Sequence, residues 1–271
     1  MKKAASFALG CKVNQYESEA IAELFAEKGY EIVGIDEEAD VYVINTCTVT
    51  NFGDKKSRQL IRKVKRQNEN AIVAVVGCYA QTAPKELMEI AGVNLVIGTK
   101  DRAQIVEMVE QYDRANGVEN HVSDIMKERV FEPLSIQKLA NRTRAYLKIQ
   151  DGCSQYCSYC IIPYARGPIR SREPQEVVAE VKRLAENGFK EVVLTGIHVA
   201  SYGKDRRDTS LLDILKQVHE VEGIERIRFS SIEPNVVTEE FAQTMAALPK
   251  VCDHFHLSLQ SGCDKTLKET Q

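Results

Sequence analysis

The chain has 271 residues, of which 44% are hydrophobic, and its formal net charge is −3. This length predicts about two domains with ordinary buried cores, because one domain takes roughly 100–200 residues. The near-neutral charge excludes a general attraction to nucleic acid, so any such contact needs a local basic patch. No run of about 18 apolar residues is present, which excludes a transmembrane helix. The short apolar start is interpreted as a first strand of a cytoplasmic protein, not as a signal peptide.

The first part of the sequence alternates between strand and helix patterns. Apolar and β-branched runs predict strands at residues 4–9, 31–35, 41–44, 72–76 and 93–97. Apolar residues at helical spacing predict helices at residues 17–28, 55–67, 84–91 and 102–112. This alternation is typical of α/β proteins, and we predict a flavodoxin-like, three-layer domain with a parallel sheet over residues 1–115.

A polar stretch of mixed charge, residues 116–142, is predicted to be a linker. Beyond it, strands are predicted at residues 145–149, 191–195, 226–232 and 255–259, with helices at 174–187, 209–220 and 238–248. These repeats predict a partial (β/α) barrel over residues 143–271. Because a closed eight-stranded barrel takes about 250 residues, we expect the chain to be a truncated part of a longer protein.

Three of the eight cysteines follow the first strand of the second series in the spacing C-x3-C-x2-C: Cys153, Cys157 and Cys160. Disulfides are not expected in a cytoplasmic protein of this size. Three thiolates on one loop can bind three irons of a 4Fe-4S cluster and leave the fourth iron open for a cofactor. The alternatives are unligated buried thiols and a zinc site, although zinc sites usually show two paired C-x2-C elements.

Three more cysteines, Cys11, Cys47 and Cys78, each lie one or two residues after a predicted parallel strand. The carboxyl ends of parallel strands share one edge of the sheet, where ligands bind. We therefore predict a second three-cysteine 4Fe-4S site, with three unrelated buried thiols as the alternative. The remaining pair, Cys252 and Cys263, matches neither set and is expected to be unligated.

The wider run around the second-domain cysteines is Gly-Cys-Ser-Gln-Tyr-Cys-Ser-Tyr-Cys-Ile-Ile-Pro-Tyr-Ala-Arg-Gly-Pro-Ile-Arg-Ser-Arg, residues 152–172. It resembles the methylthiotransferases of the radical S-adenosylmethionine (SAM) superfamily. The stretches at residues 9–19, 45–51 and 76–81 are similar to the amino-terminal domain of the same family, so the resemblance covers essentially the whole chain.

This resemblance implies two 4Fe-4S clusters, one that cleaves SAM to make a radical and an auxiliary one that carries the transferred sulfur. It also implies a tRNA or ribosomal-protein substrate, an electron donor such as flavodoxin or ferredoxin, and a monomeric cytoplasmic enzyme. Family members complete the barrel and add a small carboxy-terminal β-barrel that grips tRNA; we expect both to be missing here.

Two strings indicate the subgroup: Cys-Lys-Val-Asn-Gln-Tyr-Glu at residues 11–17 and Asn-Thr-Cys-Thr-Val-Thr at residues 45–50. They are similar to the enzymes that methylthiolate C2 of N6-threonylcarbamoyladenosine, next to the tRNA anticodon. The isopentenyladenosine tRNA enzymes and the ribosomal-protein aspartate enzymes remain alternatives. Two readings from other classes also stay open: an iron–sulfur electron carrier and a zinc-bound tRNA-interaction module.

Four further residues are candidates for SAM binding: Tyr159, Gly196, Glu233 and Gln260. The last three lie at predicted strand ends, on the edge where barrel enzymes bind ligands. Each also has an ordinary structural interpretation as a packing, turn or capping residue. The sequence identifies no catalytic acid or base.

Two sets of basic residues are weaker candidates for substrate contacts. Arg166, Arg170 and Arg172 follow the cysteine loop and could bind a SAM carboxylate or a tRNA phosphate, with a solvated charged loop as the alternative. The predicted helix at residues 55–67 is the main local basic patch. A solvated face is its favoured interpretation and a tRNA phosphate contact is the alternative.

Overall fold

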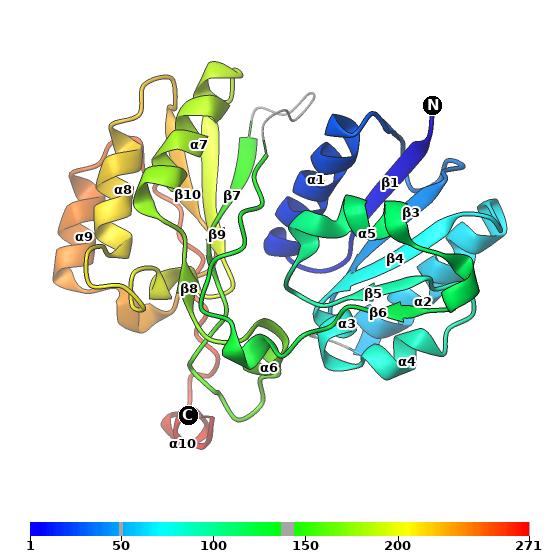
Figure 1. Cartoon of the computed structure of the whole chain (residues 1–271). Coiled ribbons are helices and arrows are strands. Elements are labelled where there is room, and N and C mark those ends of the chain that lie inside the picture. The colour runs from blue at the N-terminus through cyan, green and yellow to red at the C-terminus, as the bar shows by residue number, and fades with distance from the viewer. Residues whose placement is uncertain (49–50, 137–143, 271) are drawn as a thin grey trace. The chain divides into compact units, whose positions relative to one another are not determined.

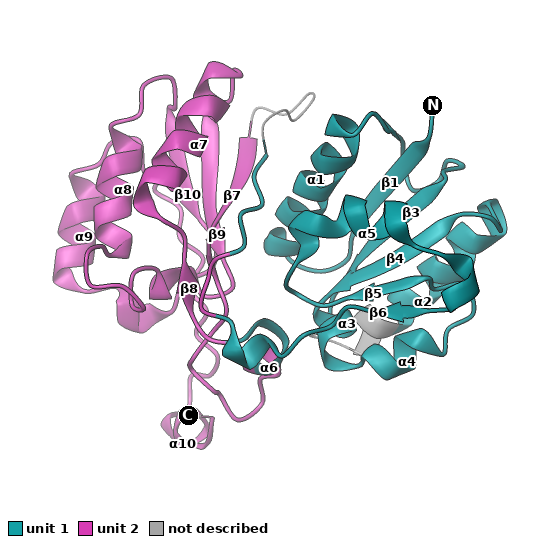
Figure 2. Cartoon of the chain, in the orientation of Figure 1, with its two compact units in different colours: residues 1–128, 132–136, 164–167 teal, residues 129–131, 137–163, 168–271 magenta. Residues whose placement is uncertain are grey.

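The chain folds into two compact units in a computed structural model, which describes residues 1–48, 51–136 and 144–270. Unit 1 comprises Met1–Glu128, Glu132–Ile136 and Tyr164–Gly167, and unit 2 comprises the rest (Figure 2). Residues 49–50 of the subgroup string and residues 137–142 of the predicted linker lie outside the described residues.

Unit 1 is built on a six-stranded, all-parallel sheet with the order β2-β1-β3-β4-β5-β6. Its strands are β1 (Lys3–Ala8), β2 (Glu31–Ile32), β3 (Val41–Thr46), β4 (Ile72–Gly77), β5 (Leu95–Ile97) and β6 (Glu119–Asn120). The first five follow the 2-1-3-4-5 order of flavodoxin-like proteins, so the predicted fold is confirmed.

Helices cover both faces of this sheet (Figure 1). They are α1 (Lys12–Glu27), α2 (Asn51–Gln67), α3 (Cys78–Thr82), α4 (Pro84–Met88) and α5 (Ile105–Gln111). Because successive strand residues point to opposite faces, β3 contributes to two cores. Tyr42 and Ile44 pack with α2, α3 and α4, whereas Val41 and Val43 pack with α1 and α5.

Unit 2 is built on a four-stranded sheet with the order β10-β9-β7-β8. Its strands are β7 (Arg144–Asp151), β8 (Arg170–Ser171), β9 (Glu191–Gly196) and β10 (Arg226–Phe229). The strands β7, β9 and β10 pair in parallel, and the two-residue β8 pairs antiparallel with β7. Helices α7 (Pro174–Glu186), α8 (Leu211–His219) and α9 (Glu239–Ala246) connect and flank these strands, and α10 (Asp264–Glu269) follows (Figure 1).

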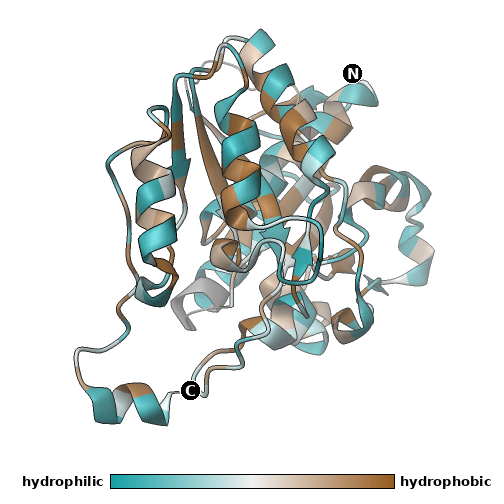
Figure 3. Ribbon diagram, turned by 90° about the vertical axis from the view of Figure 1, so that its left-hand side faces the viewer, coloured by the Kyte–Doolittle hydropathy of each residue, from teal (hydrophilic) through white to brown (hydrophobic). Residues whose placement is uncertain are grey.

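The helices of unit 2 are amphipathic, as the mixed colouring in Figure 3 shows. In α7 the apolar Val177, Val181 and Leu184 are buried at helical spacing, which lets one side of the helix pack on the sheet. Within the described ranges, no helix combines the length and the apolarity needed to cross a membrane.

The prediction of a fourth parallel strand at residues 255–259 is wrong. This segment makes one isolated parallel bridge, which pairs Leu257 with Ile232. Its large side chains stay exposed: Phe255 is 40% exposed and Leu259 62% exposed. A continuous parallel strand is normally buried on both faces, whereas the described residues cover this segment only in part, as where Phe229 and Phe241 contact Phe255.

We expect Gly77→Ala to destabilise the chain strongly, because Gly77 ends β4 with φ of 95°. A Cβ atom there would lie 2.3 Å from Oδ1 of Asn45 and 2.6 Å from the carbonyl oxygen of Thr46. The left-handed backbone and the clash together should lower the free energy of unfolding by about 3 kcal/mol, measured by urea denaturation. Gly29→Ala is the control: its φ is 85° with no atom within 4 Å of the new Cβ, so about 1 kcal/mol is expected. Equal losses for both variants would contradict the clash argument.

Candidate iron–sulfur sites

The parallel sheet of unit 1 brings Cys11, Cys47 and Cys78 to its carboxyl edge. Cys11 lies between β1 and α1, Cys47 directly follows β3, and Cys78 is the first residue of α3 after β4. These three strands are neighbours in the sheet. A Cβ atom on Gly10 would lie 2.7 Å from Sγ of Cys47, so the absence of a side chain at Gly10 leaves room for that thiol beside the β1 loop.

A fully buried arginine, Arg166, lies among these cysteines. It ends α6 (Ile162–Arg166), and residues Tyr164–Gly167 belong to unit 1. Its Nε lies 3.1 Å from Sγ of Cys78, and its Nη2 donates to Oδ1 of Asn14 at 2.7 Å. The same Asn14 oxygen accepts from the Cys11 thiol at 3.5 Å, so the guanidinium is linked to two of the three cysteines.

The Arg166 charge is balanced by Glu17, which is fully buried on α1. Oε1 of Glu17 lies 2.5 Å from Nη1 of Arg166, and Oε2 lies 2.6 Å from Nη1 of Arg102. Arg102 in turn pairs with Glu132 at 2.5 Å. Buried charges of this kind require partners, because an unpaired charge in a protein interior is strongly unfavourable.

The surroundings of Cys11 and Cys78 favour the protonated thiol. Burial raises the pKa of Cys78, and the nearby positive charge of Arg166 opposes this shift. Desolvation by neighbouring groups also raises the pKa of Cys11, although part of that residue reaches solvent. Iron binding would replace these protons, and Arg166 would then face a thiolate.

The unit 2 cysteines lie on the loop that follows β7. The loop is fixed at its start by Asp151, whose Oδ1 accepts from the backbone N–H of Gly152 at 2.8 Å. Oδ2 of Asp151 binds the fully buried Lys148 at 3.0 Å. Cys153 is buried, whereas Cys157 and Cys160 are partly exposed. Burial, together with the other two cysteines, raises the pKa of the Cys153 thiol.

Among the described residues, no three His, Cys, Asp or Glu side chains are arranged to hold a single metal ion. A four-iron cluster has a different requirement, since each cysteine binds a different iron and the thiols stand apart. Both three-cysteine sets fit such a cluster in donor chemistry and in placement at a sheet edge.

The predicted SAM-binding residues lie at different places in unit 2. Gly196 ends β9, where a Cβ atom would lie 2.7 Å from Oε1 of the buried Gln150; close packing alone therefore demands glycine here. Glu233 pairs with Nε2 of His198 at 3.2 Å. Tyr159 is 59% exposed on the cysteine loop, and Gln260 has a left-handed φ of 64° in the exposed segment after β10.

The interpretation of the three arginines as a solvated loop is wrong. Arg166, Arg170 and Arg172 are 0%, 3% and 4% exposed. Arg172 pairs with Glu180 at 2.5 Å, and Arg170 lies 3.7 Å from Asp151. A contact with a tRNA phosphate needs an exposed guanidinium, so we propose no such contact for these residues.

Sequence reasoning missed the polar residues that support both sites. Asn14 and Glu17 lie three and six residues after Cys11 and are buried on α1. Lys148 and Asp151 are buried next to the cysteine loop of unit 2. A detectable signal was present for Glu17, a charged residue three and four positions before Ala20 and Ile21 on the apolar face of the predicted helix at residues 17–28. Asn14 lies before the predicted helix, although the observed α1 includes it.

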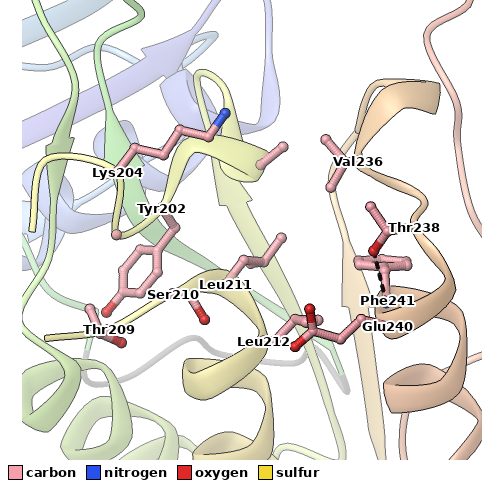
Figure 4. Close-up of a pocket in the computed structure, with 12 residues that line it drawn as sticks. Tyr202, Lys204, Thr209, Ser210, Leu211, Leu212, Val236, Thr238, Glu240 and Phe241 are labelled. Carbon is pink, nitrogen blue, oxygen red and sulfur yellow. Dashed lines mark hydrogen bonds between the residues drawn. The ribbon is translucent and has the colours of Figure 1, made fainter. Parts of the chain in front are cut away.

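A cavity of about 410 Å³ lies elsewhere in unit 2, at the amino-terminal ends of α8 and α9 (Figure 4). Tyr202, Lys204 and Phe241 are among its lining residues. The helix ends there are already capped, because Ser210 accepts from the N–H of Asp213 and Thr238 from the N–H of Phe241. None of the predicted site residues lines this cavity.

Comparison with known protein families agrees with both units. Residues 3–98 match the family described as uncharacterized protein family UPF0004, and residues 147–271 match the radical SAM superfamily. These matches define a radical SAM protein that carries a UPF0004 domain, and the superfamily implies a 4Fe-4S cluster and SAM. The chain belongs to the methylthiotransferase family that combines these two domains.

Curated relatives of this family align along nearly the whole chain. The threonylcarbamoyladenosine tRNA methylthiotransferase MtaB of Bacillus subtilis (strain 168) is 49% identical over 99% of this chain and 60% of its own length. The Aquifex aeolicus protein of the same name is 41% identical over 98% of this chain and 65% of its own length. The tRNA-2-methylthio-N(6)-dimethylallyladenosine synthase of Dictyoglomus thermophilum is 35% identical over 96% of this chain and 59% of its own length. The chain thus spans about 60% of the length of such relatives.

One solved structure supports the fold alone. The radical S-adenosylmethionine methyltransferase TsrM from Kitasatospora setae, with tryptophan substrate and a SAM analog bound, superposes with a TM-score of 0.59 at 17% identity. The match covers 92% of this chain and 58% of that protein.

We expect Glu17→Gln to destabilise unit 1 by about 3–5 kcal/mol, because the buried guanidinium of Arg166 would lose its carboxylate partner. Urea denaturation measures this loss. The control is Asp36→Asn, which removes the partner of Lys63 on the surface and should cost less than about 1 kcal/mol. A near-neutral Glu17→Gln variant would show that the buried network does not stabilise the fold.

Proposed function

We propose that this chain carries the two cluster sites of a tRNA methylthiotransferase acting on C2 of N6-threonylcarbamoyladenosine. The observation that carries this proposal is that each unit has three cysteines in loops at the carboxyl ends of its parallel strands. An electron carrier needs clusters but no open iron for a substrate or cofactor, whereas three cysteines leave one iron open. A zinc module needs a single site with four ligands.

In unit 2 we propose that Cys153, Cys157 and Cys160 hold the radical cluster. A 4Fe-4S cluster with an open iron and bound SAM supplies a 5′-deoxyadenosyl radical. The chain's own contribution is to orient the ligands. Asp151 anchors the loop through the N–H of Gly152, and the buried Lys148 holds Asp151 in place. The start of the loop is therefore held by the protein itself.

We propose SAM contacts for Glu233, Gly196, Gln260 and Tyr159. Glu233 is the best supported, because it pairs with His198, whose backbone N–H donates at 2.8 Å to Oε1 of Gln150, three residues before Cys153. His198 holds Glu233 from one side, and Nδ1 of His198 lies 2.6 Å from Oγ of Ser201. This chain of contacts restricts the carboxylate to one orientation.

In unit 1 we propose that Cys11, Cys47 and Cys78 hold the auxiliary cluster. Gly10 and Gly77 flank this site with left-handed φ values of 101° and 95°. Both approach their neighbours so closely that a side chain would collide with them. The glycines therefore let three loops converge where a bulkier chain could not.

The substrate proposal depends on the relatives and on the subgroup strings. Three relatives named threonylcarbamoyladenosine tRNA methylthiotransferase are 49%, 41% and 37% identical to this chain. The relatives named for dimethylallyladenosine from Dictyoglomus thermophilum and Akkermansia muciniphila are 35% and 36% identical. This difference favours the threonylcarbamoyl substrate.

We further propose a tRNA contact on α2 and reduction by a small carrier such as flavodoxin or ferredoxin, with the chain acting as a monomer. The exposed basic residues of α2 support the tRNA contact: Lys55, Lys56, Arg62 and Arg66. Two other basic residues of this helix are engaged, because Lys63 pairs with Asp36 and Arg58 with Glu86.

Anaerobic reconstitution tests the two-cluster proposal. We expect about eight irons per chain, because each of two clusters holds four. Replacing Cys153, Cys157 and Cys160 by Ala should leave about four irons and abolish 5′-deoxyadenosine formation from SAM. Replacing Cys11, Cys47 and Cys78 should also leave about four irons but preserve some SAM cleavage.

Metal analysis and chromatography of the nucleoside provide the readouts. Cys252→Ala is the matched control, since Cys252 belongs to neither set, and it should retain the full iron content. Stoichiometric zinc without iron would favour the zinc module. Full iron content without any SAM cleavage would favour the electron carrier.

Nucleoside mass spectrometry tests the substrate. In cells that lack the gene for this chain, we expect 2-methylthio-N6-threonylcarbamoyladenosine to disappear from tRNA and its unmethylthiolated precursor to accumulate. The methylthio form of isopentenyladenosine in the same digest is the internal control and should not change. The opposite pattern would assign the protein to the isopentenyladenosine subgroup.

A further inference from the structure

Arg166 occupies an unusual place in the chain. It follows Cys160, the last cysteine of the unit 2 loop, by six residues, yet it is buried in unit 1. Its segment is also anchored there by Thr99, whose hydroxyl donates to the carbonyl oxygen of Ala165 at 2.7 Å. A fully buried arginine costs much desolvation free energy, so its position calls for specific partners.

The partners are arranged to suit the planar guanidinium. One edge binds Glu17 through Nη1 at 2.5 Å, Nη2 binds Asn14 at 2.7 Å, and Nε is directed at Sγ of Cys78 at 3.1 Å. A lysine ammonium could not reach all of these groups, because it is a single point of charge on a flexible stem. The carboxylate and the amide thus orient the Nε–H donor toward sulfur.

The charge balance also points to the sulfur. Glu17 pairs with both Arg166 and Arg102, so its single negative charge does not neutralise Arg166 alone. Cys78 is only 3% exposed, and a thiolate there would be strongly unfavourable without a positive charge beside it. Hydrogen bonds to ligating sulfurs and the local net charge are what set the reduction potential of an iron–sulfur cluster.

We propose that Arg166 is a positioning residue of the auxiliary cluster site: its Nε–H donates to the sulfur of Cys78, holds that ligand in place, and raises the reduction potential of the cluster. This inference rests on the proposed function, since it needs a cluster on Cys11, Cys47 and Cys78. Asn14 and Glu17 act through Arg166 by fixing its orientation. The segment that follows the cysteine loop of unit 2 therefore supplies the side chain of Arg166 to the auxiliary cluster site of unit 1.

The test uses the full chain with Cys153, Cys157 and Cys160 replaced by Ala, so that one cluster site remains. In this background we compare Arg166→Gln and Arg166→Lys with Arg102→Lys. The last is the matched control, because Arg102 is equally buried and binds the same carboxylate, but its other ion pair is with Glu132. The readouts are iron per chain and an anaerobic redox titration followed by electron paramagnetic resonance.

We expect Arg166→Gln to lower the equilibrium constant for one-electron reduction at least tenfold, which corresponds to about 59 mV toward lower potential. Arg166→Lys keeps the charge but loses the oriented donor, so it should fall between Arg166→Gln and the parent. Arg102→Lys should leave the potential close to that of the parent. Loss of iron in both Arg166 variants, with iron retained in Arg102→Lys, would also support the positioning role.

Two results would overturn the inference. Unchanged potentials in the Arg166 variants at full iron content would show that Arg166 does not act on the cluster. Equal effects of the Arg166 and Arg102 substitutions, including equal loss of folding by circular dichroism, would show a merely structural role. A parent that takes up no iron would instead refute the auxiliary cluster itself, so the two failures are distinguishable.

Discussion

The parallel pairing of strands is the constraint on which the rest of the structure depends. In unit 1 every strand pair is parallel, and in unit 2 only the two-residue β8 is antiparallel. Each parallel strand therefore ends at the same edge, and the loops that follow neighbouring strands must meet there. Because the cysteines lie in these loops, residues as distant in sequence as Cys11 and Cys78 are linked through Asn14 and Arg166.

Negative charge on thiols that lie buried together at a sheet edge is unfavourable, and buried polar residues lie next to these thiols. Thiolates are disfavoured in such surroundings, as the raised pKa values of Cys78 and Cys153 show. In unit 1 a buried arginine next to Cys78 opposes the shift, and Glu17 in turn balances the arginine. In unit 2 the pair of Lys148 and Asp151 anchors the loop backbone. In both sites, therefore, buried ion pairs lie next to the cysteines.

Local features of the fold could be predicted because the interactions that produce them act over a few residues. Apolar periodicity predicted most helices and strands of unit 1, and their alternation predicted a parallel sheet. The short α3 and the two-residue β6, which lies within the predicted linker, were not predicted. The failure at residues 255–259 has the same origin: a β-like pattern forms a strand only where other chain segments cover it, and Phe255 and Leu259 stay exposed. The interpretation of Arg166, Arg170 and Arg172 as a solvated loop was wrong for a similar reason. The carboxylates that pair with Arg166 and Arg172 come from other elements.

The sequence by itself determined the order of the two domains, the cysteine spacing and the family resemblance, because all three depend on residue identity along the chain. Only the tertiary structure decided which side chains surround the cysteines. Arg166 and Glu17 are separated by 149 positions, and no local pattern relates them. Their pairing follows from burial, since charged groups removed from water must find opposite charges wherever the fold places them.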